Sequence, residues 1–222
     1  MSKASGTGAV STVVYDLGQV LIGWDPNRVW SRTMSPEQIS EFTETINFRA
    51  LNHSLDAGRP FEDAHAQVRA TWPAHALPLR QYWDAFADSL TGPIPGSAEL
   101  VAELHAAGIR LLGLTNWSAE TFHHAREAAP ALGLLEDILV SGREGVAKPD
   151  PAIFSLLIDR FGLRPAETVF VDDSLPNVEA AEAAGLRGIH FRSTADLRRR
   201  LADLGLPVDR GRGPSDAPPR TA

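Results

Sequence analysis

Side chains that could bind cations and anions follow four apolar runs of this sequence. They are Asp16 after TVVY, Thr115-Asn116 after RLLGL, Lys148 in the loop after ILV, and Asp172-Asp173-Ser174 after VFV. In open α/β sheets, ligands bind outside the carboxyl ends of the strands, so these residues are expected at one rim. Carboxylates so close to one another are destabilising unless a cation neutralises them. A ligand set made only of oxygen atoms suits Mg²⁺. The pattern therefore predicts a magnesium site.

Alternating strand and helix patterns would position these residues. The expected strands are residues 12–15, 109–114, 138–140, 168–171 and 188–191. Four helices are expected in the second half of the chain. The first is capped by Ser97, and the others begin near Ala119, at Asp150-Pro151 and at Pro176. Repeated strand–helix units indicate a parallel sheet with helices on both faces, so the sequence predicts an α/β fold.

A helical pattern interrupts this alternation after the first strand. Apolar residues from Phe61 to Trp72, and again from Leu79 to Leu90, repeat at the spacing of one helix face. Ser35-Pro36-Glu37-Gln38 has the form of a capping box. The expected organisation is a flexible tail over 1–10, an α/β core over 11–24 and 93–207, a helical cap over 25–92 and a disordered tail over 208–222.

The composition of the 222 residues excludes several classes of protein. Hydrophobic residues make up 43% and charged residues 22%, as in ordinary globular domains. The net charge of −7 repels phosphate backbones, so nucleic acid is not an expected partner. No run approaches the roughly 20 apolar residues of a membrane span, no secretory signal is recognisable, and Cys is absent. We expect a cytoplasmic protein without a membrane partner, as a monomer or a weak homodimer.

The four motifs resemble those of the haloacid dehalogenase (HAD) superfamily of aspartate-nucleophile hydrolases. They stand here in the family's order as VVYDLG, LLGLTN, AKPD and VFVDDS. DLGQVL, WDPNRV and DAGRPF resemble, in particular, the branch that holds sugar-1-phosphate phosphatases and the amino-terminal phosphatase domain of soluble epoxide hydrolases. The resemblance implies a Rossmann-like core with an inserted small all-α cap.

The resemblance also implies roles for individual residues. The catalytic set is Asp16 as nucleophile, Lys148 as its partner, and Thr115 with the Asn116 backbone N–H as contacts of the phosphoryl group. The metal set is Asp16, the Gly18 carbonyl and Asp173, with Asp172 holding a metal-bound water. Leu17, Gly18 and Trp24 are further candidates for binding the substrate, and Asn177 stands where many members have an acidic residue that orients Lys148.

One position departs from the family pattern. Most phosphatases of the superfamily have a general acid and base two residues after the nucleophile, where this chain has Gly18. Such a group is typically worth about 10²–10⁴-fold in rate. The expected function is a Mg²⁺-dependent phosphatase of a small phosphorylated metabolite, for example a sugar phosphate. The alternatives are a 2-haloacid dehalogenase, in which the same Asp attacks carbon, and a catalytically silent relative that binds a ligand or a protein.

Overall fold

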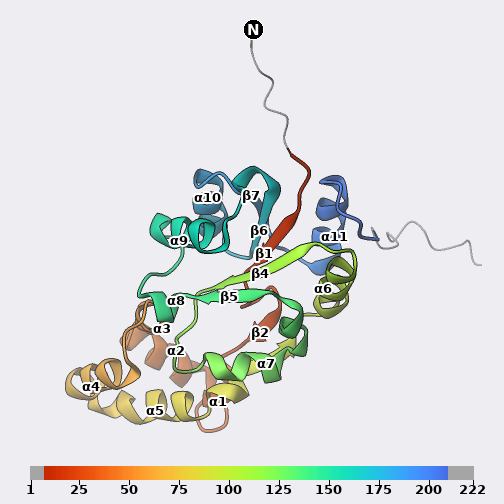
Figure 1. Ribbon diagram of the computed structural model, residues 1–222. Coiled ribbons are helices and arrows are strands. Elements are labelled where there is room, and N and C mark those ends of the chain that lie inside the picture. Colours follow the sequence, from red (N-terminus) through yellow and green to blue (C-terminus); the bar gives the residue numbers. More distant parts are fainter. Residues whose placement is uncertain (1–7, 210–222) are drawn as a thin grey trace, which may run out of the picture.

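A five-stranded parallel sheet forms the centre of the molecule. The computed structural model describes residues 8–209, and the strands follow the order β5-β4-β1-β6-β7 (Figure 1). Their bounds are Thr12–Tyr15 (β1), Arg110–Thr115 (β4), Asp137–Val140 (β5), Thr168–Asp172 (β6) and Arg187–His190 (β7). Each lies within a residue or two of its predicted position, and the predicted α/β fold is confirmed.

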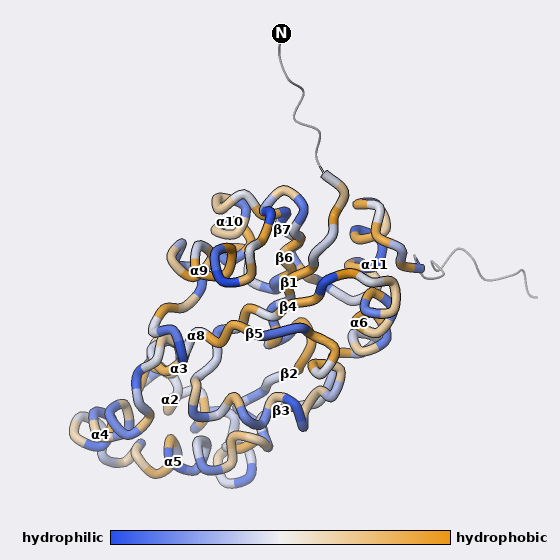
Figure 2. Tube along the Cα trace, viewed as in Figure 1, coloured by the Kyte–Doolittle hydropathy of each residue, from blue (hydrophilic) through white to orange (hydrophobic). Residues whose placement is uncertain are grey.

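Helices cover both faces of this sheet because successive strand residues point to opposite sides. Val13 and Tyr15 contribute to one apolar core and Val14 to another. The first face is covered by α6 (Ser97–Ala106), α7 (Ala125–Ala128) and α11 (Thr194–Asp203), and the second by α9 (Pro151–Phe161) and α10 (Leu175–Ala183). In Figure 2 the strands of this sheet are largely apolar, with hydrophilic residues at some of their ends, as expected for a sheet buried on both sides.

Two short antiparallel strands join the sheet to a group of helices. β2 (Ile22–Trp24) pairs with β3 (Leu90–Pro93), and residues 25–89 between them are here called the helical insert. Its helices are α1 (Asn27–Trp30), α2 (Pro36–Thr45), α3 (Phe48–Asp56), α4 (Phe61–Thr71) and α5 (Ala76–Asp84). The ring of Trp30 lies 5.0–5.1 Å from those of Phe42, Phe48 and Tyr82, which gives the insert an apolar centre of its own. The capping box at Ser35 is present.

The helix predicted through Leu90 ends earlier, and the prediction is wrong there. α5 stops at Asp84, a 3₁₀ turn covers Phe86–Ser89, and Leu90 begins β3. The Ser89 hydroxyl donates to the Phe86 carbonyl oxygen at 2.6 Å, which closes that turn locally. The apolar spacing therefore continues through a turn and a strand, and residues 90–92 belong to the β2–β3 pair.

Two helix starts also differ from the prediction. Ser97 makes no capping hydrogen bond, because Gly96 with a φ of 77° takes the cap position and Ser97 is already helical. Instead of one helix from about Ala119, the chain forms 3₁₀ turns on either side of the four-residue α7. The helix predicted from Asp150 is confirmed, and the Asp150 side chain accepts from the Ala152 N–H.

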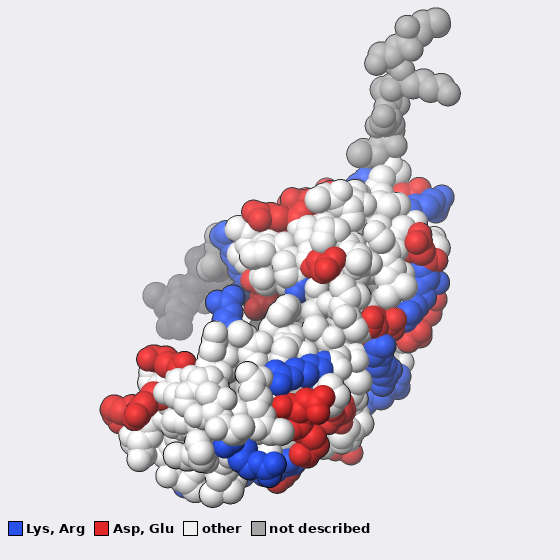
Figure 3. All heavy atoms as spheres, turned by 90° about the vertical axis from the view of Figure 1, so that its left-hand side faces the viewer, with Lys and Arg blue, Asp and Glu red and all other residues white. Residues whose placement is uncertain are grey.

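The ends of the described chain pack on the core. Val10 is buried, and Arg187 donates to the Gly8 carbonyl oxygen at 2.9 Å, so residues 8–10 are not the loose tail that was predicted. Val208 packs against the core, and the predicted tails otherwise lie outside the described residues. Within residues 8–209, no helix is both long and apolar enough to cross a membrane. On the face drawn in Figure 3, acidic and basic side chains are interspersed.

Candidate active site

The carboxyl ends of three neighbouring strands bring the sequence motifs together. β1 lies between β4 and β6, and Tyr15 is in register with a residue of each neighbour. Asp16 follows β1, Thr115 closes β4 and Asp172 closes β6. Because the strands are parallel, these residues lie at one edge of the sheet.

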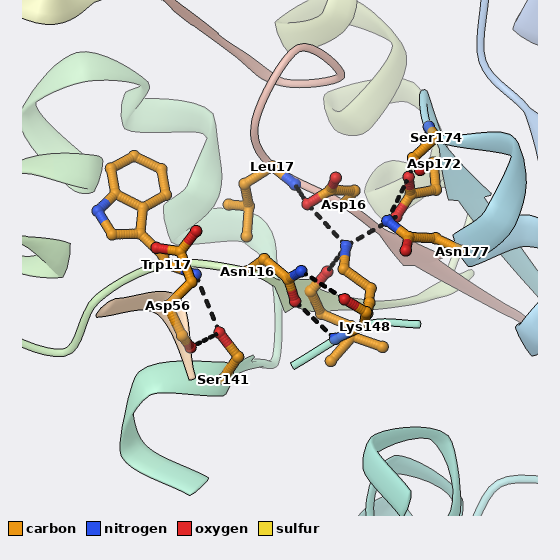
Figure 4. A network of polar contacts seen from close by, with 11 residues as sticks. Asp16, Leu17, Asp56, Asn116, Trp117, Ser141, Lys148, Asp172, Ser174 and Asn177 are labelled. Atoms are coloured by element: carbon orange, nitrogen blue, oxygen red, sulfur yellow. Dashed lines mark hydrogen bonds and ion pairs between the residues drawn. The ribbon is translucent and has the colours of Figure 1, made fainter. Parts of the chain in front are cut away.

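Lys148 lies at the centre of this edge with its side chain fully buried. Its Nζ is 3.0 Å from Asp16 Oδ1 and 2.7 Å from Asp172 Oδ2, and it donates to the Leu114 carbonyl oxygen at 2.9 Å. Three acceptors use the three N–H bonds of the ammonium group. Burial by itself lowers the pKa of Lys148, but the two carboxylates raise it above its ordinary value. Lys148 is therefore a fixed positive charge between two carboxylates (Figure 4).

The Asn116 side chain holds the backbone of Lys148. Asn116 Nδ2 donates to the Lys148 carbonyl oxygen at 2.9 Å, and the Lys148 N–H donates to Asn116 Oδ1 at 2.8 Å. This pair of bonds joins the end of β4 to the loop that carries the lysine. The role expected for Asn116 concerned only its backbone N–H. The structure shows in addition that its side chain positions the backbone of Lys148.

Asp172 is completely buried, and its carboxylate is held from three directions. Besides Lys148, the Ser174 N–H donates to Oδ1 at 2.8 Å, and Asn177 Nδ2 lies 3.0 Å and 3.1 Å from the two oxygens. Asn177 stands where, by the resemblance, many members have an acidic residue that orients Lys148, and here its amide contacts Asp172. The structure gives Asp172 the role of anchoring the lysine.

The acidic groups at this edge outnumber the lysine. Ligand oxygens of Asp16, Asp172 and Asp173 all lie within 4.8 Å of one another. Burial raises the pKa of Asp16 to about 7, although Lys148 opposes the shift, and Asp172 adds to it. Burial, and then Asp172, also raise the pKa of Asp173. Three carboxylates around one ammonium group favour a further cation, and an all-oxygen donor set fits Mg²⁺.

The turn after Asp16 leaves room beside the nucleophile candidate. The Leu17 N–H donates to Asp16 Oδ1 at 2.6 Å, and the Ile22 N–H donates to the Leu17 carbonyl oxygen at 2.8 Å. The Gly18 carbonyl takes part in neither bond. A Cβ built on Gly18 would meet nothing within 4 Å, so the space that an acidic side chain would fill is open.

Thr115 presents an unsatisfied hydroxyl at the same edge. The residue is 1% exposed, and its Oγ1 has no hydrogen-bond partner among the described residues. A buried hydroxyl without a partner costs about 1–3 kcal/mol. A ligand, a water or an ion can satisfy such a group, and an oxyanion beside Asp16 would do so.

A cavity of about 780 Å³ opens over this edge, between the core and the helical insert. Its lining includes Asn47, Phe48, Arg49, Asn52, His53 and Asp56 from the insert, and Asn116, Lys148, Ser174 and Asn177 from the core. Trp24 lines it as well, and together with Trp117 it also lines a recess of about 100 Å³ that shares Asp56 and Asn116 with the cavity. The structure thus places Trp24, a candidate for binding the substrate, on the wall of this cavity.

Sequence reasoning missed the carboxylate that the insert contributes. Asp56 ends α3 and lies beside Trp117 and Asn116 in Figure 4, yet it comes 40 residues after Asp16, and its segment DAGRPF was assigned to the cap and noted for its resemblance without a role for the carboxylate. The signal was its place two residues before Gly58, which has a φ of 95° and approaches the loops of the core. The sequence does not reveal which way an acidic residue at a helix end points.

Several curated proteins are similar to this chain. Sesquiterpene phosphatase astK of Aspergillus oryzae is 26% identical over 86% of this chain and 94% of that protein. Drimenol cyclase drtB of Aspergillus calidoustus is 27% identical over 91% of this chain, which spans only 38% of that protein. Phosphoserine phosphatase of Thermus thermophilus is 32% identical over 72% of this chain and 61% of that protein.

Solved structures share the fold. A HAD family enzyme of Bacteroides thetaiotaomicron, in complex with magnesium and inorganic phosphate, matches 83% of this chain and 96% of its own at a TM-score of 0.64 and 20% identity. L-2-haloacid dehalogenase of Xanthobacter autotrophicus, with chloropropionic acid covalently bound, matches 89% of this chain and 84% of its own at a TM-score of 0.59 and 20% identity. The model of haloacid dehalogenase-like hydrolases matches residues 12–185, most of the described chain. With the motifs gathered at one edge of the sheet, this match shows that the chain belongs to the haloacid dehalogenase-like hydrolase family.

Proposed function

We propose that this hydrolase is a Mg²⁺-dependent phosphatase that cleaves a small phosphate ester by way of a phosphorylated Asp16. The observation that carries the proposal is the buried Lys148 held between Asp16 and Asp172, with a third carboxylate near by and an unsatisfied Thr115 hydroxyl. Phosphoryl transfer asks mainly for positioning and for positive charge near the phosphoryl oxygens. These groups supply both.

In the first step, an Asp16 carboxylate oxygen bonds to phosphorus and the bond from phosphorus to the ester oxygen breaks. Lys148 balances the charge of Asp16 and of the phosphoryl oxygens, and the Thr115 hydroxyl donates to one of them. In the second step, water attacks phosphorus, releases inorganic phosphate and restores Asp16. The same residues serve both steps because the phosphoryl group stays in place between them.

Magnesium would be held by Asp16, Asp173 and the Gly18 carbonyl, and it would supply positive charge to the phosphoryl oxygens. Asp172 is engaged with Lys148, Ser174 and Asn177, so in this proposal its contact with the metal runs through water. The fit rests on the oxygen donors that lie within 4.8 Å of one another.

The helical insert is proposed to act as the cap that covers the substrate and excludes water from the cavity. The Asn47 and Asn52 amides suit the hydroxyl groups of a sugar phosphate, and Arg49 and His53 suit an anionic substrate. The cavity volume of about 780 Å³ is in the range of small-molecule sites.

Phosphatase chemistry is favoured over dehalogenation by the acidic cluster. Attack on carbon by Asp16 needs no cation, whereas Asp173 beside two buried carboxylates is costly without one. Two of the similar curated proteins carry the name phosphatase, and one structure with this fold holds magnesium and phosphate. The dehalogenase with the same fold shows that the architecture by itself does not separate the two reactions.

The test is phosphate release from an aryl phosphate and a panel of small phosphate esters, with Mg²⁺ and with chelator. We expect turnover that chelator and Asp16→Asn both abolish, while Asp159→Asn, an exposed carboxylate on α9, serves as the matched control. Halide release from a 2-haloacid without added metal would favour the dehalogenase.

Binding of the metal has a readout apart from activity. Mg²⁺ at 100 times its Kd should raise the free energy of unfolding by about 2.7 kcal/mol, measured by urea denaturation. Asp173→Asn should weaken that effect. No turnover by a folded protein that still binds phosphate esters would favour the silent relative.

A further inference from the structure

The proposed function leaves two proton transfers without a group to perform them. The leaving oxygen of an alkyl ester takes up a proton, and the water that attacks phosphorylated Asp16 gives one up. Gly18 has no side chain, and Lys148 already donates to three acceptors. The group must therefore come from elsewhere on the cavity wall.

Among the described residues that line the cavity, the side chains besides Lys148 that can both give up and take up a proton are His53 and Asp56, because the guanidinium of Arg49 stays protonated. His53 is exposed and lines only the larger cavity, whereas Asp56 is partly buried and also lines the recess next to Asn116 and Trp117. Asp56 thus lies on the side of the insert that faces the motif following β4.

The core holds Asp56 in place even though the residue belongs to the insert. The Ser118 N–H donates to its carboxylate, and the Ser141 hydroxyl donates to its backbone carbonyl oxygen. Asn52 Nδ2 donates to Oδ2 at 3.0 Å. Ser118 follows the Thr115-Asn116 motif by two residues, so the carboxylate is tied to the same loop that positions Lys148. Its orientation is fixed by both layers of the molecule.

Close packing supports this placement. Gly58, two residues after Asp56, approaches the core so closely that a Cβ there would lie 3.2 Å from the Gly142 carbonyl oxygen and 3.3 Å from Gly145 Cα. The turn that carries Asp56 is therefore seated on the loops of the core, and the carboxylate has little freedom to leave the cavity.

We propose that Asp56 is the proton-transfer group that replaces the acid and base absent at Gly18. In the first step, the Asp56 carboxyl gives its proton to the ester oxygen as the bond from phosphorus to that oxygen breaks. In the second, the Asp56 carboxylate takes a proton from water as the oxygen of that water bonds to phosphorus and the bond to Asp16 breaks. The products are the alcohol and inorganic phosphate, and Asp56 ends protonated, as it began. This inference rests on the proposed function.

The acidity of Asp56 suits both roles. Burial raises its pKa to about 7, while the Ser118 N–H and the Lys148 charge lower it. The other titratable groups that face it are Tyr82, whose pKa is raised by burial and by Asp56, and His53 and Arg49 on the cavity wall. A group with a pKa near the working pH serves well as acid and as base.

Asp56→Asn tests the proposal when alkyl and aryl phosphates are compared. With an alkyl phosphate, whose leaving oxygen needs a proton, kcat should fall by about 10²–10⁴-fold. With an aryl phosphate, whose phenolate leaves without one, phenol should appear in a burst, followed by slow hydrolysis of phosphorylated Asp16. In the wild type, ionisation of Asp56 should make kcat on the alkyl ester fall as pH rises. This fall should be absent in Asp56→Asn.

Matched variants separate proton transfer from a structural effect. Asp63→Asn, an exposed carboxylate of α4 in the insert, should change neither reaction. Gly18→Asp in the Asp56→Asn background should restore alkyl phosphate turnover, because the space beside Gly18 is open. If Asp56→Asn does not fold, Asp56→Glu takes its place, and we expect it to retain the pH dependence at a reduced kcat.

The failure of this inference is distinguishable from that of the proposed function. Wild-type turnover that Asp16→Asn abolishes, but that Asp56→Asn leaves within about twofold on both esters, would overturn the role of Asp56 alone. That role is also overturned if Asp56→Asn slows both esters equally without a burst. No phosphate release by the folded wild-type protein on any ester would overturn both proposals.

Discussion

Asn116→Ala should impair the site although the Asn116 side chain is not a proposed contact of the phosphoryl group. Asn116 holds the Lys148 backbone by bonds of 2.9 Å and 2.8 Å, and these are the bonds between the end of β4 and the lysine loop that the substitution removes. Lys148 is 1% exposed, so water cannot readily replace the lost partners. The substitution therefore leaves a buried N–H and a buried carbonyl oxygen unsatisfied.

The expected magnitude follows from these two groups. Each buried polar group left unsatisfied costs about 1–3 kcal/mol, and the two are neighbours that relax together, so the free energy of unfolding should fall by about 2–4 kcal/mol. The lysine loop should then shift relative to Asp16. A displacement of about 1 Å in a positioning residue costs about 10²-fold in rate, so kcat should fall by that order.

The assay combines urea denaturation with phosphate release at saturating substrate. Asn27→Ala, an exposed asparagine of the insert, is the control and should change both quantities little. Asn116→Asp keeps an acceptor for the Lys148 N–H but sets an oxygen against the Lys148 carbonyl, so it should recover only part of the stability. If Asn116→Ala stays within about 0.5 kcal/mol and twofold of the wild type, Asn116 does not position the lysine.

Two other predictions concern Thr115 and Asp56. Thr115→Val removes a buried hydroxyl without a partner, so the protein should be as stable as the wild type or more stable, while kcat falls by about 10²–10³-fold. Thermal unfolding measures the stability and phosphate release measures kcat. An unchanged kcat would exclude a contact between the Thr115 hydroxyl and the phosphoryl group. The folded-state pKa of Asp56 is about 7 against an ordinary 3.8, so the native protein binds more protons than the unfolded chain between those values. The contribution of Asp56 to stability should therefore fall as pH rises from 4 to 7, by up to about 1.4 kcal/mol per pH unit. In urea denaturation, the free energy of unfolding should decline less steeply with pH for Asp56→Asn than for the wild type. Equal slopes would contradict the raised pKa of Asp56.

The strands and the core of the site follow from local sequence patterns. Apolar runs such as VFV end in polar residues, and parallel strands bring their carboxyl ends to the same edge, so Asp16, Thr115 and Asp172 are predictable neighbours. Lys148 is harder, because it stands in a loop eight residues beyond β5 and only its motif placed it. Its contact with Asp16 lies where the resemblance implied it, whereas its contact with Asp172 was not predicted and comes from the structure.

Patterns of spacing failed where tertiary contacts decide the local structure. β2 and β3 pair across the whole insert, and the pairing that turns Leu90 into a strand residue leaves no mark in the residues around it. Ser97 is a residue type typical of a helix N-cap, but Gly96, with its positive φ, occupies the cap position and Ser97 is the first helical residue. The positioning role of the Asn116 side chain and the direction of Asp56 depend on which loops meet in space, which single-residue patterns do not encode.

The placement of Asp56 links proton transfer to the seating of the insert. An acid at Gly18 would stand on the same loop as the nucleophile and would be in place whatever the insert does. Asp56 is in place only while its turn rests on the core, where Ser118 and Ser141 donate to it. If the insert moves away to admit substrate, the proton donor leaves with it, so an ester bound in an open cavity cannot be cleaved through this group. Gly18→Asp should therefore loosen the dependence of turnover on the seating of the insert, because it returns the acid to the nucleophile's own loop.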